Sequence, residues 1–376
     1  MKKSIFSFVI LLIFSSLTLI DAQQYDKLND KQLADHPYWI DMMQNESVNF
    51  YTVQHAFEVY WKDRKITKGC GWKPFKRWEY MMSSRVNADG SRPPADLVWQ
   101  EYHSYLDKFP DSKSATGNWE NLGPHLIPSK GYEGLGRINA LGFHPTEART
   151  IYIGAPSGGF WLSEDYGASW RTTTDQLPSL GVSSIAVDYD DPSIIYIGTG
   201  DRDANDAAGI GVLKSFDGGE NWTLYNNGMG NATVGRLVMH PENPLTLWAA
   251  TSNGIFKTIN GGQNWENKRG GNFKELVMKP DDPDILYASA GGGFYRSANG
   301  GEFWEQINSG IPGGSRAVIA ATPANSQLVY FLLTTSDSYK GLYRSTDAGL
   351  NFTEMSTSPN IMSWGCYGGD GGQAWY

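Results

Sequence analysis

Residues 163–170 read SEDYGASW, and four variants of this octapeptide follow: SFDGGENW at 215–222, TINGGQNW at 258–265, SANGGEFW at 297–304 and STDAGLNF at 345–352. The shared pattern is Ser or Thr, any residue, Asp or Asn, any residue, Gly, two further residues and an aromatic ring. The copies start 52, 43, 39 and 48 residues apart. This spacing is typical of a four-stranded propeller blade, so the sequence predicts an all-β propeller.

Each octapeptide has the chemistry of a tight turn between two strands. The Asp or Asn at the third position can accept backbone N–H groups, and the Gly at the fifth position takes φ > 0 without a steric penalty. The closing ring buries a large apolar face between neighbouring blades. We therefore predict fold roles, and not catalytic ones, for ten residues. They are Asp165, Trp170, Asp217, Trp222, Asn260, Trp265, Asn299, Trp304, Asp347 and Phe352.

The segments that precede the octapeptides repeat as well. An apolar strand comes first, then a turn with Pro in most copies, a strand with an aromatic residue, and a strand that ends at the octapeptide. Four strands are predicted in each of five complete blades, with the octapeptide between the third and the fourth. Residues 361–364 would open a sixth blade. Residues 118–121, which include Trp119, resemble the fourth strand of a blade, but no first three strands precede them. We expect an incomplete ring whose missing strands lie beyond residue 376.

The first 22 residues have the order of a cleavable signal peptide. Lys2 and Lys3 precede an uncharged apolar run over residues 5–20, which is followed by Ala22 and a polar stretch. The run is about 16 residues long, shorter than the ~20 that a membrane span needs. We expect a secreted or cell-surface protein with no membrane span after cleavage, and an uncleaved anchor is the alternative.

Residues 23–117 differ from the rest because they have few Gly and many aromatic residues at helical spacing. Three helices are predicted: one capped by Asn45 or Ser47, one that begins at Pro74 and one that begins at Pro94. Their apolar faces are Phe50, Val53, Phe57 and Tyr60; Phe75, Trp78 and Met82; and Val98, Tyr102 and Tyr105. The predicted division is a signal peptide over 1–22, a helical segment over 23–117 and a propeller over 118–376. We expect the basic and aromatic stretch over 65–77 to be part of a helical collar docked on the propeller rim, with its cations in solvent. A ligand-binding patch is the alternative.

Charge and cysteine content limit the classes of partner. The formal net charge is −9 and there is no long basic block, so we expect no nucleic-acid partner. Cys70 and Cys366 are the two cysteines. Export would permit a disulfide between them, but two cysteines are too few for a disulfide-built scaffold.

The repeats resemble a known family. WENLGP at 119–124, GRIN at 136–139, His144-Pro145, Gly158-Gly159 and the five octapeptides are similar to Asp-box (bacterial neuraminidase repeat) propellers of the sortilin type and their bacterial glycosyl-hydrolase-like relatives. The resemblance covers roughly residues 118–376. It implies the fold strongly and function weakly, because Asp boxes occur in sialidases, xyloglucanases, photosystem assembly factors and sorting receptors. The helical segment resembles leaders of large exported Bacteroidota proteins, so we expect a fragment of such a protein.

Two enzyme classes within this resemblance lack part of their machinery. A sialidase-like site needs three arginines around the substrate carboxylate; Arg137 lies in the first predicted inner strand and would point into the channel. Its candidate companions are Arg202, Arg236 and Arg316, which do not make a convincing triad. A xyloglucanase-like enzyme would carry a catalytic Asp before the third strand of the first blade, but residues 154–159 (GAPSGG) contain no carboxylate.

The loop over residues 198–206 (GTGDRDAND) is the richest in functional groups. Asp201, Asp203 and Asp206 offer hard oxygen ligands for Ca²⁺, although the loop lacks the Gly and Glu of an EF-hand. The simpler interpretation is a polar loop beside the channel whose carboxylates make local turn bonds. Asp370 lies in a Gly-rich turn, and Asp201 with Asp370 is the candidate catalytic pair if their carboxyl groups lie ~6.5–9.5 Å apart.

The sequence therefore predicts a propeller that binds an extracellular protein or a glycan at its channel face, since loops on rigid blades suit recognition. The alternative is a glycoside hydrolase that acts on polysaccharide, of the sialidase or xyloglucanase type. No cofactor is expected other than the calcium ion considered above. The candidate ligand-binding residues are Arg137, Asp201, Asp203, Asp206, Trp364 and Asp370.

Overall fold

The computed structural model describes residues 25, 27–45, 47–67, 70–109, 136–177, 179–336, 338–363 and 374. The predicted signal peptide and the positions Trp119, Trp364, Cys366 and Asp370 lie outside these residues. The chain forms two compact units, one up to Pro94 and one from Ala95 onward. Each unit is described separately.

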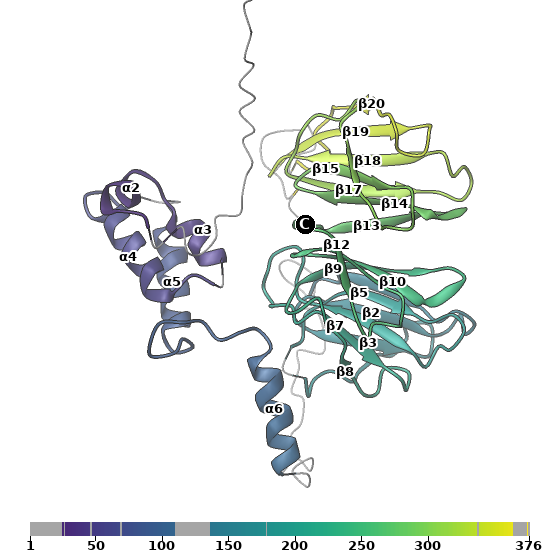
Figure 1. Ribbon diagram of the computed structural model, residues 1–376, viewed down its shortest axis with the longest axis horizontal. Coiled ribbons are helices and arrows are strands. Elements are labelled where there is room, and N and C mark those ends of the chain that lie inside the picture. The colour runs from purple at the N-terminus through teal and green to yellow at the C-terminus, as the bar shows by residue number, and fades with distance from the viewer. Residues whose placement is uncertain are drawn as a thin grey trace, which may run out of the picture. The chain divides into compact units, whose positions relative to one another are not determined.

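The second unit contains five antiparallel sheets of four strands each, in chain order (Figure 1). This confirms the predicted propeller blades. The first sheet consists of β1 (Ala140–Phe143), β2 (Ile151–Ala155), β3 (Gly159–Ser163) and β4 (Arg171–Thr172), and the second of β5 (Val182–Val187), β6 (Ile195–Thr199), β7 (Val212–Ser215) and β8 (Thr223–Leu224). The third consists of β9 (Val234–His240), β10 (Asn243–Thr251), β11 (Gly254–Thr258) and β12 (Glu266–Arg269). The fourth consists of β13 (Glu275–Lys279), β14 (Asp282–Ala290), β15 (Gly293–Ser297) and β16 (Glu305–Ile307), and the fifth of β17 (Arg316–Ala321), β18 (Val329–Thr334), β19 (Tyr339–Ser345) and β20 (Thr353–Ser356).

The first strands of the blades line the propeller axis. β1 contacts β5, β5 contacts β9, β9 contacts β13, and β13 contacts β17. These inner strands run in the same direction, because each blade repeats the same meander. All of them therefore start at one end of the propeller, and the octapeptide turns, which follow the third strands, lie at the opposite end.

The five octapeptides form one repeated turn between the third and fourth strands. In the second copy, the Ser215 hydroxyl donates to Asp217 Oδ1 at 2.8 Å and accepts the Gly219 N–H at 2.8 Å. Asp217 Oδ1 also accepts the N–H of Asn221 at 2.9 Å. The other four copies make the same three bonds at the corresponding positions. The first-position hydroxyl thus matters as much as the third-position acceptor, a role that the sequence analysis did not assign.

The glycine and the aromatic ring of the motif also behave as predicted, with one exception. The fifth-position glycines all have positive φ, between 79° at Gly301 and 94° at Gly219. The closing rings are buried in four copies, with exposed fractions from 1% at Trp304 to 7% at Trp222. Trp222 packs edge-on against Phe160 of the preceding blade, with ring centroids 5.1 Å apart. Trp170 of the first copy is the exception, at 37% exposed.

Basic residues placed directly before the octapeptides join each blade to the next. Lys214 Nζ donates to the carbonyl of Gly261 at 3.1 Å, and Arg296 Nε donates to the carbonyl of Ala348 at 2.9 Å. Lys257 instead forms an ion pair with Glu302 at 2.7 Å. Each partner lies in the octapeptide of the following blade, so the turns also hold neighbouring sheets together.

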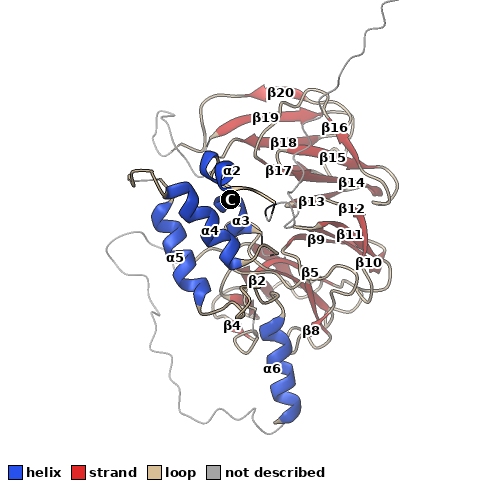
Figure 2. Cartoon of the chain, turned by 60° about the vertical axis from the view of Figure 1, so that its left-hand side comes forward, coloured by secondary structure: helices blue, strands red, loops and turns tan. Residues whose placement is uncertain are grey.

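The first unit is a small bundle of α2 (Asp30–Asp35), α3 (Trp39–Gln44), α4 (Phe50–Trp61) and α5 (Trp72–Ser83), shown in blue in Figure 2. Its core is aromatic: Phe57 and Phe75 stack with centroids 3.6 Å apart, and Trp39 packs edge-on against both. The predicted helices exist, but two boundaries differ. Asn49 caps α4 in place of Asn45 or Ser47, because its side chain accepts the Tyr51 N–H. α5 starts at Trp72, two residues before Pro74.

The helix predicted after Pro94 is α6 (Leu97–Lys108), and it belongs to the propeller unit. Trp99 is 7% exposed because it packs into the core shared by the first two blades. The Asp96 carboxylate also accepts the side-chain amide of Asn231 at 2.8 Å. The compact helical unit therefore ends at Pro94 and not at residue 117, and Val98 and Tyr105 are exposed rather than on a buried face. None of the helices in the described part of the chain combines the length and apolar character needed to cross a membrane.

Candidate functional site at the propeller mouth

Charged residues gather at the end of the propeller where the inner strands begin, which we call the mouth. The loops that join second to third strands return to this end, because the register pairs the start of each inner strand with the end of its neighbour. The mouth brings together five cations and three carboxylates. They are Arg137, Arg202, Arg236, Lys274 and Arg316, with Asp201, Asp203 and Glu275.

Asp201 is a buried anchor of the loop after β6. Its side chain is fully buried, it pairs with Arg137 at 2.6 Å, and it accepts the Asn139 amide at 3.1 Å. The N–H groups of Asp203 and Ala204 donate to its two oxygens, both at 3.1 Å. Burial raises the pKa of Asp201, but the N–H bonds from Asp203 and Asp206 and the charge of Arg137 outweigh it and hold the pKa below the ordinary value. Asp201 therefore stays ionised and shapes the loop.

The remaining arginines are held by two other carboxylates. Asp203 pairs with Arg316 at 2.6 Å and with Arg202 at 3.5 Å. Glu275, at the start of β13, pairs with Arg202 at 3.4 Å and with Arg236 at 3.1 Å. The arrangement is a continuous chain of alternating charges that joins the second, third, fourth and fifth blades.

A pocket of about 340 Å³, with mostly polar and charged lining residues, opens beside this charge chain, between the fourth and fifth blades. Lys274 and Arg316 supply its two cations. Burial, followed by the charge of Arg316, lowers the pKa of Lys274, and within the described part of the chain no carboxylate forms an ion pair with it. The pocket is lined by Asn272, Lys274, Ser289, Gly291, Ser315, Arg316, Ala317, Thr335 and Ser336. Such a lining offers several hydrogen-bond donors and hydroxyl acceptors to a hydrophilic ligand.

The structure shows how the candidate site residues at the mouth are held. Asp201 is not placed as a catalytic acid, because its carboxylate is covered and occupied by protein donors. The four arginines do not converge on a free substrate position, because carboxylates of the protein hold them.

Asp201, Asp203 and Asp206 do not form a cation cage either. No group of three His, Cys, Asp or Glu residues in the described ranges could hold a metal ion. Asp206 is exposed and contributes its backbone N–H to Asp201 at 3.3 Å. This geometry weighs against the calcium alternative and supports the interpretation as a loop held by local turn bonds.

Trp364 and Asp370 lie outside the described residues, so their placement at the channel stays a prediction. The same holds for the disulfide, because Cys366 is also outside them.

Sequence reasoning missed Lys274, Glu275 and the polar pocket. A usable signal was present: Glu275 and Arg316 are charged residues at the first position of strands whose next three residues are apolar. A charge at that position must find a partner or a ligand, because an isolated buried charge is costly. Comparison of the five strand starts would therefore have indicated the mouth.

Comparison with known proteins shows a similar fold and a sequence similarity over part of the chain. No protein-family model matches the sequence. A probable oligoxyloglucan-reducing end-specific xyloglucanase from Neosartorya fischeri is 28% identical over 148 residues, which are 36% of this chain and 18% of that protein. Two solved structures are similar: an ancestral GH74 enzyme (TM-score 0.51, 20% identity, 64% of this chain and 33% of that one) and the GH74 xyloglucanase from Xanthomonas campestris (0.47, 19%, 63% and 39%). The chain thus spans less than two fifths of the length of each relative, and it shares their propeller fold.

Proposed function

We propose that this chain is the propeller of a polysaccharide-directed, glycoside-hydrolase-like protein, and that its mouth binds the glycan. The pocket beside Lys274 and Arg316 carries the proposal. Its volume of about 340 Å³ falls at the lower end of the range of ligand pockets, and seven of its nine lining residues have polar or charged side chains. Sugar hydroxyls require such donors and acceptors at close range. The sequence match to a xyloglucanase supports polysaccharide as the ligand class, and the signal-peptide-like start supports an extracellular site of action.

Binding of the full chain to a panel of soluble polysaccharides, xyloglucan first, tests this proposal. Lys274→Ala removes an ammonium that would donate to the ligand, and hydrogen bonds to charged groups contribute about 1.5–3 kcal/mol, so we expect a loss of roughly ten- to hundredfold in affinity. Arg149→Ala is the matched control, because it removes an exposed cation from the β1–β2 turn at the other end of the first blade. Unchanged affinity in Lys274→Ala, or no binding to any glycan of the panel, contradicts the proposal.

Cleavage of the polysaccharide is the second candidate, favoured by the match to a xyloglucanase. A reducing-sugar assay on the same samples separates it from recognition alone. Release of sugar that Asp370→Ala abolishes would establish cleavage. Binding without release leaves recognition as the function. A protein ligand, as for sortilin-type propellers, would instead appear as an absence of glycan binding together with capture of a polypeptide.

A further inference from the structure

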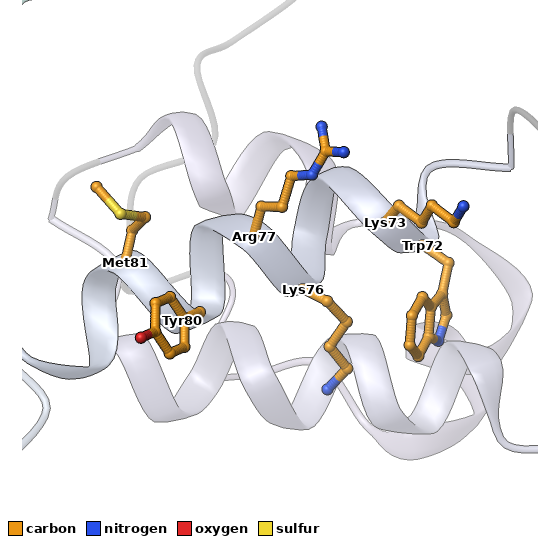
Figure 3. A pocket seen from close by; sticks show the side chains of 6 residues that line it. All are labelled: Trp72, Lys73, Lys76, Arg77, Tyr80 and Met81. Atoms are coloured by element: carbon orange, nitrogen blue, oxygen red, sulfur yellow. The ribbon is translucent and has the colours of Figure 1, made fainter.

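The outer face of α5 in the helical unit carries a groove that the propeller site does not explain. Its volume is about 540 Å³. Figure 3 shows its six side chains in two rows along the helix. One row is Trp72, Lys76 and Tyr80, and the other is Lys73, Arg77 and Met81. Residues four apart lie on the same face of a helix, so each row is a continuous stripe.

The groove is cationic, and two of its cations are available to a ligand. Lys76 is engaged, because it pairs with Glu79 at 2.7 Å and lies over the ring of Phe75 at 5.5 Å. Lys73 and Arg77 are exposed and make no ion pair or side-chain hydrogen bond within the described residues. The surrounding sequence reinforces this charge: residues 62–92 contain nine Lys and Arg but only three Asp and Glu, in a chain of net charge −9.

Of the two aromatic rings of the groove, Tyr80 stands clear of the core, and Trp72 packs against the core from its edge. Phe75 is fully buried and points into the bundle, whereas Tyr80 on the opposite face is 80% exposed. Trp72 is half-buried at the other end of the groove. Eight residues separate Trp72 from Tyr80, which is about 12 Å along a helix. Two platforms therefore flank the free cations.

We propose that this face of α5 binds an acidic polysaccharide, with Trp72 and Tyr80 under sugar rings and Lys73 and Arg77 on carboxylates. The C–H faces of a pyranose carry partial positive charge and pack on the negative face of an aromatic ring. Charge-assisted hydrogen bonds from Lys and Arg suit sugar carboxylates. The site is separate from the propeller pocket in its residues and in the charge of its ligand.

Two other polyanions fit this groove less well. Nucleic acid presents one charge per nucleotide and binds through many phosphate contacts, whereas only two cations here are unengaged. An anionic membrane surface calls for a broad apolar stripe with aromatic and Leu side chains that enter the acyl region. Of the large apolar side chains that the structure describes on α5, only Tyr80 and Met81 are exposed, and cations separate them from Trp72.

Affinity electrophoresis and calorimetry of the full chain with polygalacturonate test the proposal, with dextran as the neutral glycan. The groove variant is Lys73→Glu with Arg77→Glu, and the matched control is Lys27→Glu with Lys31→Glu, two exposed lysines at the same four-residue spacing in the same unit. We expect at least a tenfold loss in the groove variant and little change in the control. Tyr80→Ala should weaken binding several-fold without any change in charge.

Three outcomes overturn the proposal: equal losses in the groove and control variants, unchanged binding in both groove variants, or stronger binding of the wild type to phosphatidylglycerol vesicles or to single-stranded DNA than to polygalacturonate. Lys274→Ala distinguishes the two proposed sites. It should leave polygalacturonate binding unchanged while it weakens binding at the propeller mouth.

Discussion

The two ends of the propeller are built on opposite principles. At the octapeptide end, five turns repeat the same bonds among residues four or fewer positions apart, as Ser215, Asp217 and Gly219 do. At the mouth, no two blades carry the same pairing, and the partners are distant in sequence: Arg137 and Asp201 are 64 residues apart. Repetition preserves the fold, whereas variation leaves room for a site. The changes below test this division.

Trp304→Ala should have the largest effect on stability. Its ring is 1% exposed and packs in the core between the third and fourth blades with Trp248 and Leu286. Loss of a buried aromatic residue costs about 3–5 kcal/mol of unfolding free energy. Trp170→Ala is the control at the equivalent position, and we expect a loss of only about 1 kcal/mol because this ring is 37% exposed. Urea unfolding measures both, and equal losses would show that burial between blades is not what the ring contributes.

Glu275→Gln tests the charge chain of the mouth. It removes the negative charge that pairs with Arg202 and Arg236. The positive charges of their guanidinium groups are then only partly balanced by neighbouring carboxylates. Breaking a buried pair costs about 3–5 kcal/mol, and because Gln retains some hydrogen bonding we expect about 2 kcal/mol.

Glu302→Gln provides the comparison on the surface of the propeller. Glu302 also faces two lysines, Lys257 and Lys268, each at 2.7 Å, but its side chain is 48% exposed. Exposed pairs contribute at most about 1 kcal/mol, and salt weakens them. A loss in Glu302→Gln as large as that in Glu275→Gln would mean that the mouth has no special electrostatic role.

The same contrast explains what the sequence could predict. The octapeptides contain their own partners: the residue types at positions one, three and five make the turn, so local spacing predicts the blades. The loop around Asp201 was recognised as special from its composition alone. The partners of its charges could not be predicted, because Arg316 and Glu275 belong to the fifth and fourth blades and lie near the loop only in the folded propeller. The distinction between a free and an occupied arginine therefore required the fold.

Asp347→Asn changes how the octapeptide end responds to acid. Bonds from Asn351, and then from Ser345, lower the pKa of Asp347 to about 2. Since this folded-state pKa lies below the unfolded value near 3.8, the carboxylate stabilises the fold above about pH 4, and that contribution disappears as the pH falls toward 2. The variant should lose this acid dependence, so its difference from the wild type shrinks between pH 4 and 2. Asn299→Asp is the reverse control, because it places a carboxylate at the third position of a turn that has an amide there. Unfolding free energies at pH 7, 4, 3 and 2 measure the effect, and a constant difference across them would contradict it.

Tyr166→Gly should have the smallest effect, and it should be stabilising. The fourth position of each octapeptide has positive φ: Gly218, Gly261 and Gly300 occupy it in three copies, whereas Tyr166 adopts φ 62° in the first. A residue with a Cβ is strained there by roughly 1–2 kcal/mol, and Gly relieves this strain. Gly also raises the conformational entropy of the unfolded chain, which offsets part of the stabilisation. The Tyr166 ring is 73% exposed, so little packing is lost, and we expect a gain of about 0.5–1 kcal/mol. Gly218→Ala is the matched opposite, since an added Cβ would meet no atom within 4 Å and only backbone strain would act. If both variants shift stability in the same direction, the left-handed turn is not what selects glycine at this position.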